Sequence, residues 1–271
     1  MKFLTRSAFC TVALLCAAAA AHAGTRAIDS KEMIPSAPVA PVECKWNGFY
    51  LGANLGGAIG NADVDARAGY TDSGYLVHSD VAQIRNAGAQ DIYTEGFTGG
   101  GQAGYNFQAG RFVLGAEADF NALTLDDSHE DSRVYRSAPP TSFTIRQSVS
   151  TDWLFTARAR VGFTVGRCLI YATGGLALTE INYDGLFTDN YAAARATGSI
   201  NDTKAGWTVG GGLEYQLTCR WSLKAEYLYA DFGNVSTRTS NLVADRAYNN
   251  PFFYSSDLTT HIARVGVNYH F

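Results

Sequence analysis

The chain has 271 residues and a formal net charge of −4, and 46% of its residues are hydrophobic, which suits one large domain or two small ones. Its mean hydropathy of −0.08 is too polar for a bundle of membrane-spanning helices. The acidic balance argues against nucleic acid as a partner, because nucleic-acid binding needs a basic face. The 28 glycines, 15 tyrosines and 15 phenylalanines favour strands and interfacial aromatic side chains over helices.

The first segment has the pattern of a targeting sequence. Lys2 and Arg6 precede an apolar stretch over residues 8–21, and the small-residue sequence "AHA" at residues 21–23 offers a cleavage site. Residues 1–23 are therefore predicted to be a secretory signal peptide, and the mature chain is expected to be exported. Loss of the two basic residues lowers the formal net charge from −4 to −6.

Residues 24–45 lack any hydrophobic periodicity and contain three prolines, so they are predicted to form a flexible periplasmic lead-in. After residue 24 there is no run of about 18 apolar residues, and no membrane-spanning helix is expected.

Residues 46–271 contain eight stretches long enough to cross a bilayer as tilted strands of roughly 9–11 residues. The stretches are residues 46–60, 95–108, 111–123, 151–165, 168–181, 204–217, 220–232 and 258–271. Side chains alternate in most of them: Trp153 and Phe155 lie on one face of the fourth, and Arg158 and Arg160 lie on the other. Both faces of the fifth are mostly apolar or small, and its orientation is left open. The sequence predicts an all-β, eight-stranded antiparallel transmembrane barrel.

The joins between these stretches alternate in length. Short joins lie around Gly110, Gly166 and Thr218. Long joins lie at about residues 61–93, 124–150, 182–203 and 233–257, and they carry the net acidic charge. Short periplasmic turns and four long external loops are typical of outer-membrane barrels.

Several sequence motifs carry a family resemblance over residues 46–271. The segments "WNGFYLGANLGG", "WLFTARARVGFTVG", "LIYATGGLAL", "GWTVGGGLEYQLT", "WSLKAEYLYADFG" and "IARVGVNYHF" occur in this order. They resemble the outer-membrane β-barrel domain family, and in particular the small surface proteins of alphaproteobacteria that are often called porin-family proteins. The resemblance implies an eight-stranded barrel similar to the OmpA membrane domain, placed in the outer membrane in contact with lipid and lipopolysaccharide.

The C-terminal strand ends without a tail, on alternating hydrophobic and polar residues. An exposed edge of this kind would promote aggregation, whereas pairing with the first strand would remove both edges. The resemblance implies that the barrel-assembly machinery recognises the terminal hydrophobic residues, which are Val265, Val267, Tyr269 and Phe271.

Alternation directs a set of charged side chains into the barrel. These are Glu117, Asp119, Arg158, Arg160, Glu214, Lys224, Glu226 and Arg264. Four acids and four bases in a confined space favour a paired network, because an unpaired buried charge is costly. An eight-stranded barrel has an interior just wide enough for side chains, so a plugged lumen is predicted. A narrow ion path formed by rearranging these pairs is the alternative.

The histidines do not form a recognisable catalytic or metal site. Ser255 and Ser256 lie near His261 in sequence, but alternation places His261 on the lipid face, and no enzyme activity is predicted. His78 and His129 lie in predicted loops and are weak candidates for haem ligation, which some members of the resembled family perform. No metal site or cofactor is predicted.

Three cysteines remain after signal cleavage. Cys168 and Cys219 lie at neighbouring short turns, and a disulfide between them is predicted. The alternatives are that they remain separate thiols or that Cys44 is a competing partner. The sequence as a whole predicts a non-enzymatic surface barrel that supports envelope integrity and surface interactions. A small porin is the alternative, and haem or host-ligand binding through the aromatic-rich loops is a further one.

Overall fold

The computed structural model describes residues 44–72, 74–244 and 247–271. The predicted signal peptide and all but the last two residues of the lead-in lie outside this part of the chain. The described residues form one helix and eight strands: β1 Gly48–Ala68, α1 His78–Gly88, β2 Gln90–Ala109, β3 Phe112–Val134, β4 Ser142–Val165, β5 Cys168–Asp189, β6 Arg195–Gln216, β7 Trp221–Val243 and β8 Ala247–His270.

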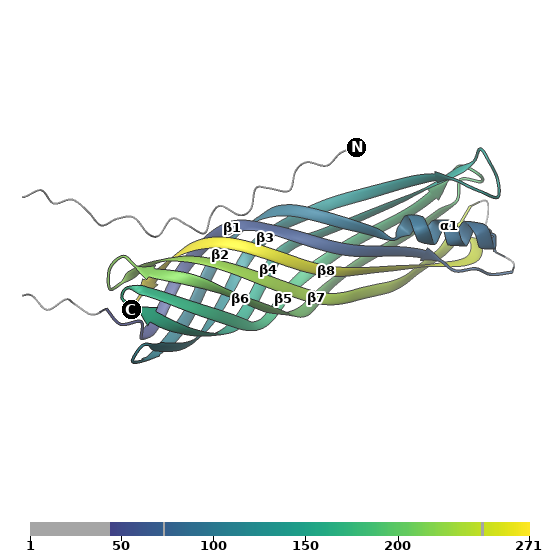
Figure 1. The fold of residues 1–271 in the computed structure, drawn as a ribbon. Coiled ribbons are helices and arrows are strands. Elements are labelled where there is room, and N and C mark those ends of the chain that lie inside the picture. Colours follow the sequence, from purple (N-terminus) through teal and green to yellow (C-terminus); the bar gives the residue numbers. More distant parts are fainter. Residues whose placement is uncertain (1–43, 73, 245–246) are drawn as a thin grey trace, which may run out of the picture. The chain divides into compact units, whose positions relative to one another are not determined.

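The strands close into an antiparallel barrel in which each strand pairs with its sequence neighbours and β1 pairs with β8 (Figure 1). The β1–β8 seam runs from the Tyr50–His270 pair to the Ala68–Phe252 pair. The backbone N–H of Phe271 also donates to the carbonyl oxygen of Phe49 at 3.0 Å. The C-terminal strand thus has no open edge, which confirms the predicted barrel closure.

The joins at one end of the barrel are short, as predicted. At one end, called here the short-turn end, residues 110–111, 166–167 and 217–220 connect consecutive strands. Gly110 and Gly166 have φ angles of +62° and +59°, a region that side chains with a Cβ rarely adopt. The chain ends on this side, while α1 lies at the opposite end, called here the helix end (Figure 1).

The last three of the four long loops predicted from the sequence consist mostly of strand residues, and the first is strand only at its two ends, so that prediction is wrong in its detail. The strands have 20 to 24 residues, about twice the length needed to cross a bilayer. Three of the joins at the helix end therefore shrink to residues 69–89, 135–141 and 190–194. The first of these contains α1, which was not predicted.

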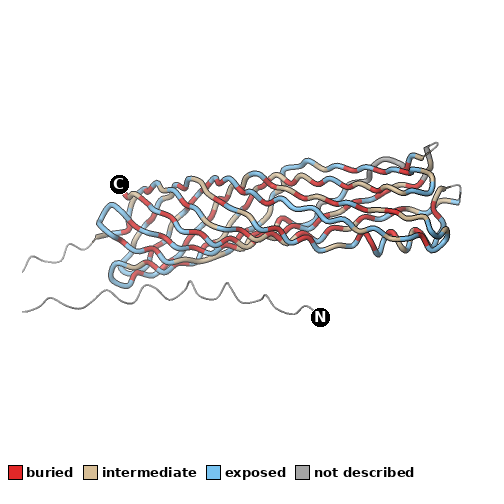
Figure 2. Tube along the Cα trace, turned by 90° about the horizontal axis from the view of Figure 1, so that it is seen from above, coloured by how far each residue is buried: buried red, intermediate tan, exposed pale blue. Residues whose placement is uncertain are grey.

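Alternation continues beyond the predicted strand ends, but its chemistry changes. On β1 the inward Val64 and Ala66 are buried, while the outward Asp63, Asp65 and Arg67 are polar. Figure 2 shows the same alternation of buried and exposed residues along the whole barrel. Polar outward side chains explain why these segments have the composition of loops although they pair as strands.

Large exposed hydrophobic side chains cover the outside of the half of the barrel nearest the short turns, and they include Leu51, Leu55, Leu114, Val161, Leu176, Val209, Leu223, Val265 and Val267. Two groups of aromatic contacts border this belt: Phe49–Tyr105, Phe112–Phe163 and Trp221–Tyr269 near the short turns, and Phe120–Trp153 and Trp207–Tyr229 farther along the strands. An apolar band between two aromatic girdles is the outer surface expected of a membrane-spanning barrel. No helix in the described ranges has the length and hydrophobicity needed to span a bilayer.

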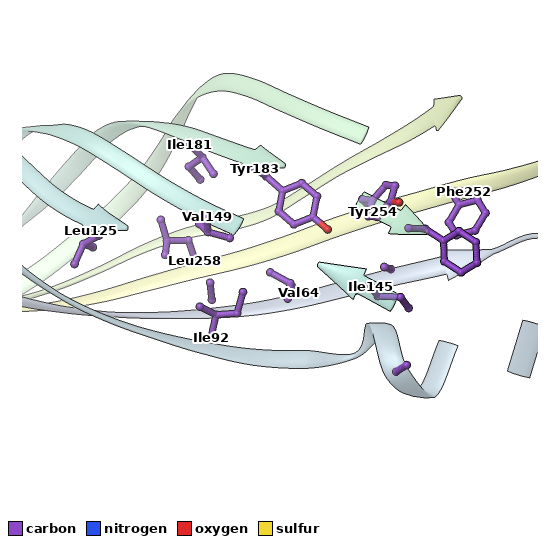
Figure 3. Close-up of a cluster of buried hydrophobic side chains, with 14 of the residues drawn as sticks. Val64, Ile92, Leu125, Ile145, Val149, Ile181, Tyr183, Phe252, Tyr254 and Leu258 are labelled. Atoms are coloured by element: carbon purple, nitrogen blue, oxygen red, sulfur yellow. The ribbon is translucent and has the colours of Figure 1, made fainter. Parts of the chain in front are cut away.

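The interior of the half nearest the helix end is a hydrophobic core. Figure 3 shows side chains of β1, β2, β3, β4, β5 and β8 that converge inside the strands: Val64, Ile92, Leu125, Ile145, Val149, Ile181, Tyr183, Phe252, Tyr254 and Leu258. Ile84 and Ala87 of α1 are fully buried in the same cluster. Burying these side chains is the main stabilising term for this half of the barrel.

Candidate functional site

The half of the barrel nearest the short turns, which carries the apolar band, is called here the membrane-spanning half. The eight charged residues predicted to face the lumen lie together inside it. Each is at most 5% exposed, and they come from five strands: β3, β4, β6, β7 and β8. Glu117–Arg158, Glu214–Lys224 and Glu226–Arg264 are direct cross-strand partners in the register. The barrel therefore brings the whole predicted set into one lumen.

Glu117 is in contact with most of the basic residues. Its carboxylate accepts hydrogen bonds from Lys224 Nζ at 2.9 and 3.0 Å and from Arg158 Nη2 at 2.5 Å. Arg160 Nη1 lies 3.6 Å from the same carboxylate, and the Tyr50 hydroxyl donates to it at 2.7 Å. Such charge-assisted hydrogen bonds are the strong ones in a low-dielectric interior.

Asp119 and Glu226 form the part of the network nearest the hydrophobic core. Asp119 accepts from Arg158 Nη2 at 2.7 Å and from Arg264 Nη1 and Nη2 at 3.2 and 3.0 Å. Glu226 accepts from Arg264 Nε at 2.8 Å and lies 3.1 Å from Arg158 Nη1. Two guanidinium groups are thus shared between two carboxylates.

Glu214 forms the part nearest the short turns. It accepts from Arg160 Nη2 at 2.8 Å, from the Ser222 hydroxyl at 2.6 Å and from Asn268 Nδ2 at 2.7 Å. His270 Nε2 lies 3.4 Å from the same carboxylate. Its lone pairs are therefore satisfied by neighbouring side chains, as buried carboxylates require.

Two buried tyrosines, which the sequence reasoning did not single out, complete the network. The Tyr50 hydroxyl accepts from Arg160 Nη1 at 2.9 Å, and the Tyr171 hydroxyl donates to Glu226 at 2.8 Å. The Arg160 guanidinium lies 4.2 Å from the centre of the Tyr171 ring, a cation–π contact. Strand alternation was the available signal for Tyr50, because residue 50 shares a face with Gly52 and Asn54.

Two lumen-facing glycines make room for these tyrosines. A Cβ on Gly104 would lie 2.3 Å from the Tyr50 hydroxyl, and a Cβ on Gly212 would lie 2.6 Å from the Tyr171 hydroxyl. Both distances are shorter than any real contact, so a larger residue would displace the ring. The glycine-rich strands serve close packing here.

The short-turn end of the lumen is occupied by Trp46, which is 1% exposed. Its backbone N–H donates to Gln108 Oε1 at 2.7 Å, and its ring packs edge-on against His270 with centroids 5.6 Å apart. Residues 44–47 therefore pass beneath the strands before β1 begins.

The predicted Cys168–Cys219 disulfide is wrong, because Cys219 is bonded to Cys44. Cys44 is the partner because residues 44–47 pass below the barrel. They bring the Cα atom of Cys44 to 4.9 Å from that of Cys219. Cys168 begins β5 and lies opposite Tyr215 in the register. The disulfide thus ties the segment that carries Trp46 to the β6–β7 turn.

The other predicted residues are dispersed. His261 Nδ1 and the Tyr227 hydroxyl form a hydrogen bond of 2.6 Å on the outward face of the barrel. Ser256 is buried on the inward face and therefore does not lie beside His261. The His78 ring stacks on Tyr70 with centroids 3.6 Å apart, and His129 lies on β3. Within the described ranges no three metal-binding side chains gather at one place.

Comparisons with known proteins agree with this architecture. The family model for the outer membrane protein beta-barrel domain matches residues 7–271. The chain belongs to this family. It is 37% identical to the 31 kDa outer-membrane immunogenic protein of Brucella melitensis over 88% of this chain and 89% of that protein.

A more distant relative is also an outer membrane protein by name. The chain is 27% identical to the 22 kDa outer membrane protein of Rhizobium leguminosarum bv. viciae, over 72% of this chain and 68% of that protein. Among solved structures, Neisserial surface protein A matches over 83% of this chain and 98% of that one, with 17% identity and a TM-score of 0.37. The family membership and the Brucella relative place the protein in the outer membrane, as a surface β-barrel.

Proposed function

We propose that the protein is a non-enzymatic surface barrel whose lumen is closed, and that it supports envelope integrity and contacts at the cell surface. The observation that carries this proposal is that buried side chains occupy the lumen at three successive levels. Trp46 lies at the short-turn end, the eight-residue ion-pair network follows, and the hydrophobic core occupies the helix end. Trp46 is aromatic, the network is charged and the core is apolar, so an ion would meet three chemically different obstacles.

The energetics of the network favour the closed lumen over an ion path. Removing one partner from a buried ion pair costs about 3–5 kcal/mol, because the other charge is left unpaired. A rearrangement that breaks a single pair at this cost is populated at roughly 1% or less, since each 1.4 kcal/mol is a factor of ten. An ion path along the whole lumen also has to pass the apolar core above the network.

Membrane lipid and lipopolysaccharide are the partners that the outer surface fits. The apolar band contacts acyl chains, and Arg111, Arg167 and Arg220 lie at the short turns, on the side of the band expected to face the periplasm. During biogenesis the barrel-assembly machinery is the expected partner of Val265, Val267, Tyr269 and Phe271, whose side chains lie on one outward face. Host or surface ligands would meet the helix end.

The small porin remains the second candidate, and one experiment separates the two. A deletion strain is compared with the same strain carrying the gene on a plasmid, for sensitivity to detergents and lipophilic dyes and for uptake of small sugars. The envelope role predicts raised sensitivity and unchanged uptake in the deletion strain. Normal sensitivity with slowed uptake, restored by the plasmid, would favour the porin and overturn the proposal.

A further inference from the structure

A small pocket at the helix end combines aromatic faces with buried carboxylate. Its volume is about 220 Å³, and its lining includes Tyr75, Leu76, Asp80, Tyr135, Ser137 and Tyr191. These residues come from the joins β1–α1, β3–β4 and β5–β6 and from the first turn of α1. The pocket lies outside the lumen network and outside the membrane-spanning half.

Asp80 gives the pocket its negative charge. It is 5% exposed, and its carboxylate accepts a hydrogen bond from the Ser137 hydroxyl at 2.8 Å and a long one from Ser79 at 3.4 Å. None of the ion pairs within 4.0 Å among the described residues involves Asp80. Its place in the first turn of α1 offsets part of the charge through the helix dipole, but a buried carboxylate still favours a cation.

A second carboxylate, Asp189, lies behind the aromatic wall. The hydroxyls of Tyr75 and Tyr135 both donate to its Oδ2, at 2.8 and 3.0 Å, and the backbone N–H of Ala194 donates to Oδ1 at 2.9 Å. A phenol that donates to an anion gains electron density on its ring, which strengthens the attraction of the ring face for a cation. Burial and the Asp189 carboxylate also raise the pKa of both phenols well above the ordinary value, so the rings stay protonated donors.

The third aromatic residue lies at the mouth of the pocket. Tyr191 is 61% exposed, and its ring contacts the Tyr75 ring edge-on with centroids 6.0 Å apart. Tyr135, by contrast, is 3% exposed and forms the floor. The pocket therefore opens to solvent beside one tyrosine and closes on another, with Asp80 inside.

These features distinguish a cation from other occupants. An anion would face Asp80 without a basic partner, and a neutral aromatic molecule would gain nothing from the carboxylate. A metal ion would find too few oxygen ligands, since no cluster of three metal-binding side chains is present in the described ranges. A substituted ammonium group presents a diffuse positive charge and apolar methyl groups, which suits tyrosine faces around one carboxylate.

We infer that this pocket binds a small substituted ammonium ion, with Asp80 as the counter-charge and Tyr75, Tyr135 and Tyr191 as the aromatic wall. The inference gives a ligand class to the surface-contact part of the proposed function. It does not depend on the closed lumen, so either can fail without the other.

The test is calorimetric titration of the refolded full-length protein with choline. The detergent is an alkyl maltoside, because zwitterionic detergents carry the same ammonium group. The neutral isostere 3,3-dimethyl-1-butanol is titrated in parallel. We expect choline to bind at least tenfold more tightly than the isostere, and glycerophosphocholine is added as a third probe to show whether a headgroup attached to a phosphate is also accepted.

Two variants and one control make the test specific. Asp80→Asn and Tyr191→Ala are each expected to weaken choline binding at least tenfold, and Tyr191 is exposed enough that its removal leaves folding intact. Asp127→Asn, an exposed acid on β3, is expected to bind choline as the unmodified protein does. Absence of choline binding, equal binding of choline and its isostere, or full binding by Tyr191→Ala would overturn the inference.

Discussion

At the scale of single residues, Glu117 connects the basic side chains of the lumen. Its carboxylate contacts Arg158, Lys224 and the Tyr50 hydroxyl. The substitution Glu117→Gln removes this negative charge and leaves the buried Arg158 and Lys224 without their anionic partner. We expect the free energy of unfolding to fall by about 3–5 kcal/mol. Urea titration of the refolded barrel, followed by the mobility of unheated samples on gels, measures the change.

The double variant Glu117→Gln/Lys224→Met is the control for this prediction. It removes one charge of each sign and restores neutrality, so it is expected to regain part of the lost stability. If Glu117→Gln changes the unfolding free energy by less than about 1 kcal/mol, the network does not stabilise the barrel in the way described.

Outside the membrane-spanning half, Asp63 lies between two other acids, opposite Asp91 on β2 and Asp257 on β8. Desolvation, followed by the hydrogen bond and charge of Asp91 and the charge of Asp257, raises the pKa of the Asp63 carboxyl. A raised carboxyl pKa costs stability above that pKa, and the cost disappears as the pH falls toward the ordinary value of the unfolded chain.

Asp63→Asn is therefore expected to stabilise the barrel at neutral pH by on the order of 0.5 kcal/mol, as for like charges on paired strands. The gain should shrink as the pH falls through the acid range. Urea titrations at neutral and acid pH compare the variant with the unmodified protein. A gain that grows toward low pH would refute the assignment.

Residue-scale prediction from the sequence had a clear limit. Period-two alternation identified which charged side chains face inward, because each strand has only two faces. The partners within the network depend on strand register and on side-chain length, as when Arg160 on β4 reaches Glu214 on β6. Alternation in one strand carries no information on either.

At the scale of elements, the segment before β1 is fixed to the barrel by the Cys44–Cys219 disulfide, whose cysteines are 175 residues apart. Cys44→Ser is expected to lower the unfolding free energy by about 2–5 kcal/mol under oxidising conditions. Cys168→Ser is the matched control and is expected to leave the Cys44–Cys219 disulfide in place. Non-reducing peptide mapping identifies the linked cysteines, and a Cys168–Cys219 peptide would contradict the assignment.

Near the helix end, the strands extend beyond the membrane-spanning half. These parts, called here the strand extensions, pack around the hydrophobic core described above. Phe187 is fully buried; its ring stacks on that of Phe143 and contacts that of Phe252 at a tilted angle. Phe187→Ala is expected to cost about 3–5 kcal/mol locally, which would open the extensions to protease while the membrane-spanning half stays intact. Limited proteolysis compares it with Val134→Ala, an exposed control. Equal protection of both variants would show that these strands do not depend on the core.

The sequence did not reveal that the strands extend beyond the lipid. Membrane strands are recognised by apolar outward residues, and this signal ends where the barrel leaves the lipid. On β1 the outward side chains change from Leu51 and Leu55 to Asp63 and Arg67, while inward residues remain buried. The inward Val64 and Ala66 alone do not distinguish a strand from a loop with scattered apolar residues.

At the scale of the whole molecule, barrel closure was predictable from the sequence. Of the residues in the lumen, the charged network was predictable and the position of Trp46 was not. Eight alternating stretches are sufficient to predict a ring, because backbone groups in lipid need partners. Trp46 was placed at the start of the first strand, whereas it occupies the short-turn end of the lumen. Its contacts with Gln108 and His270 join residues far apart in the sequence, and strand alternation does not identify such contacts.

The most direct test of the closed lumen is single-channel recording on the refolded full-length protein in a planar lipid bilayer. Parallel bilayers with a general porin show that the recording detects open channels. The account predicts no stable conductance steps above the bilayer background, because Trp46, the ion-pair network and the hydrophobic core each fill the lumen. A stable, large conductance in the unmodified protein would contradict it.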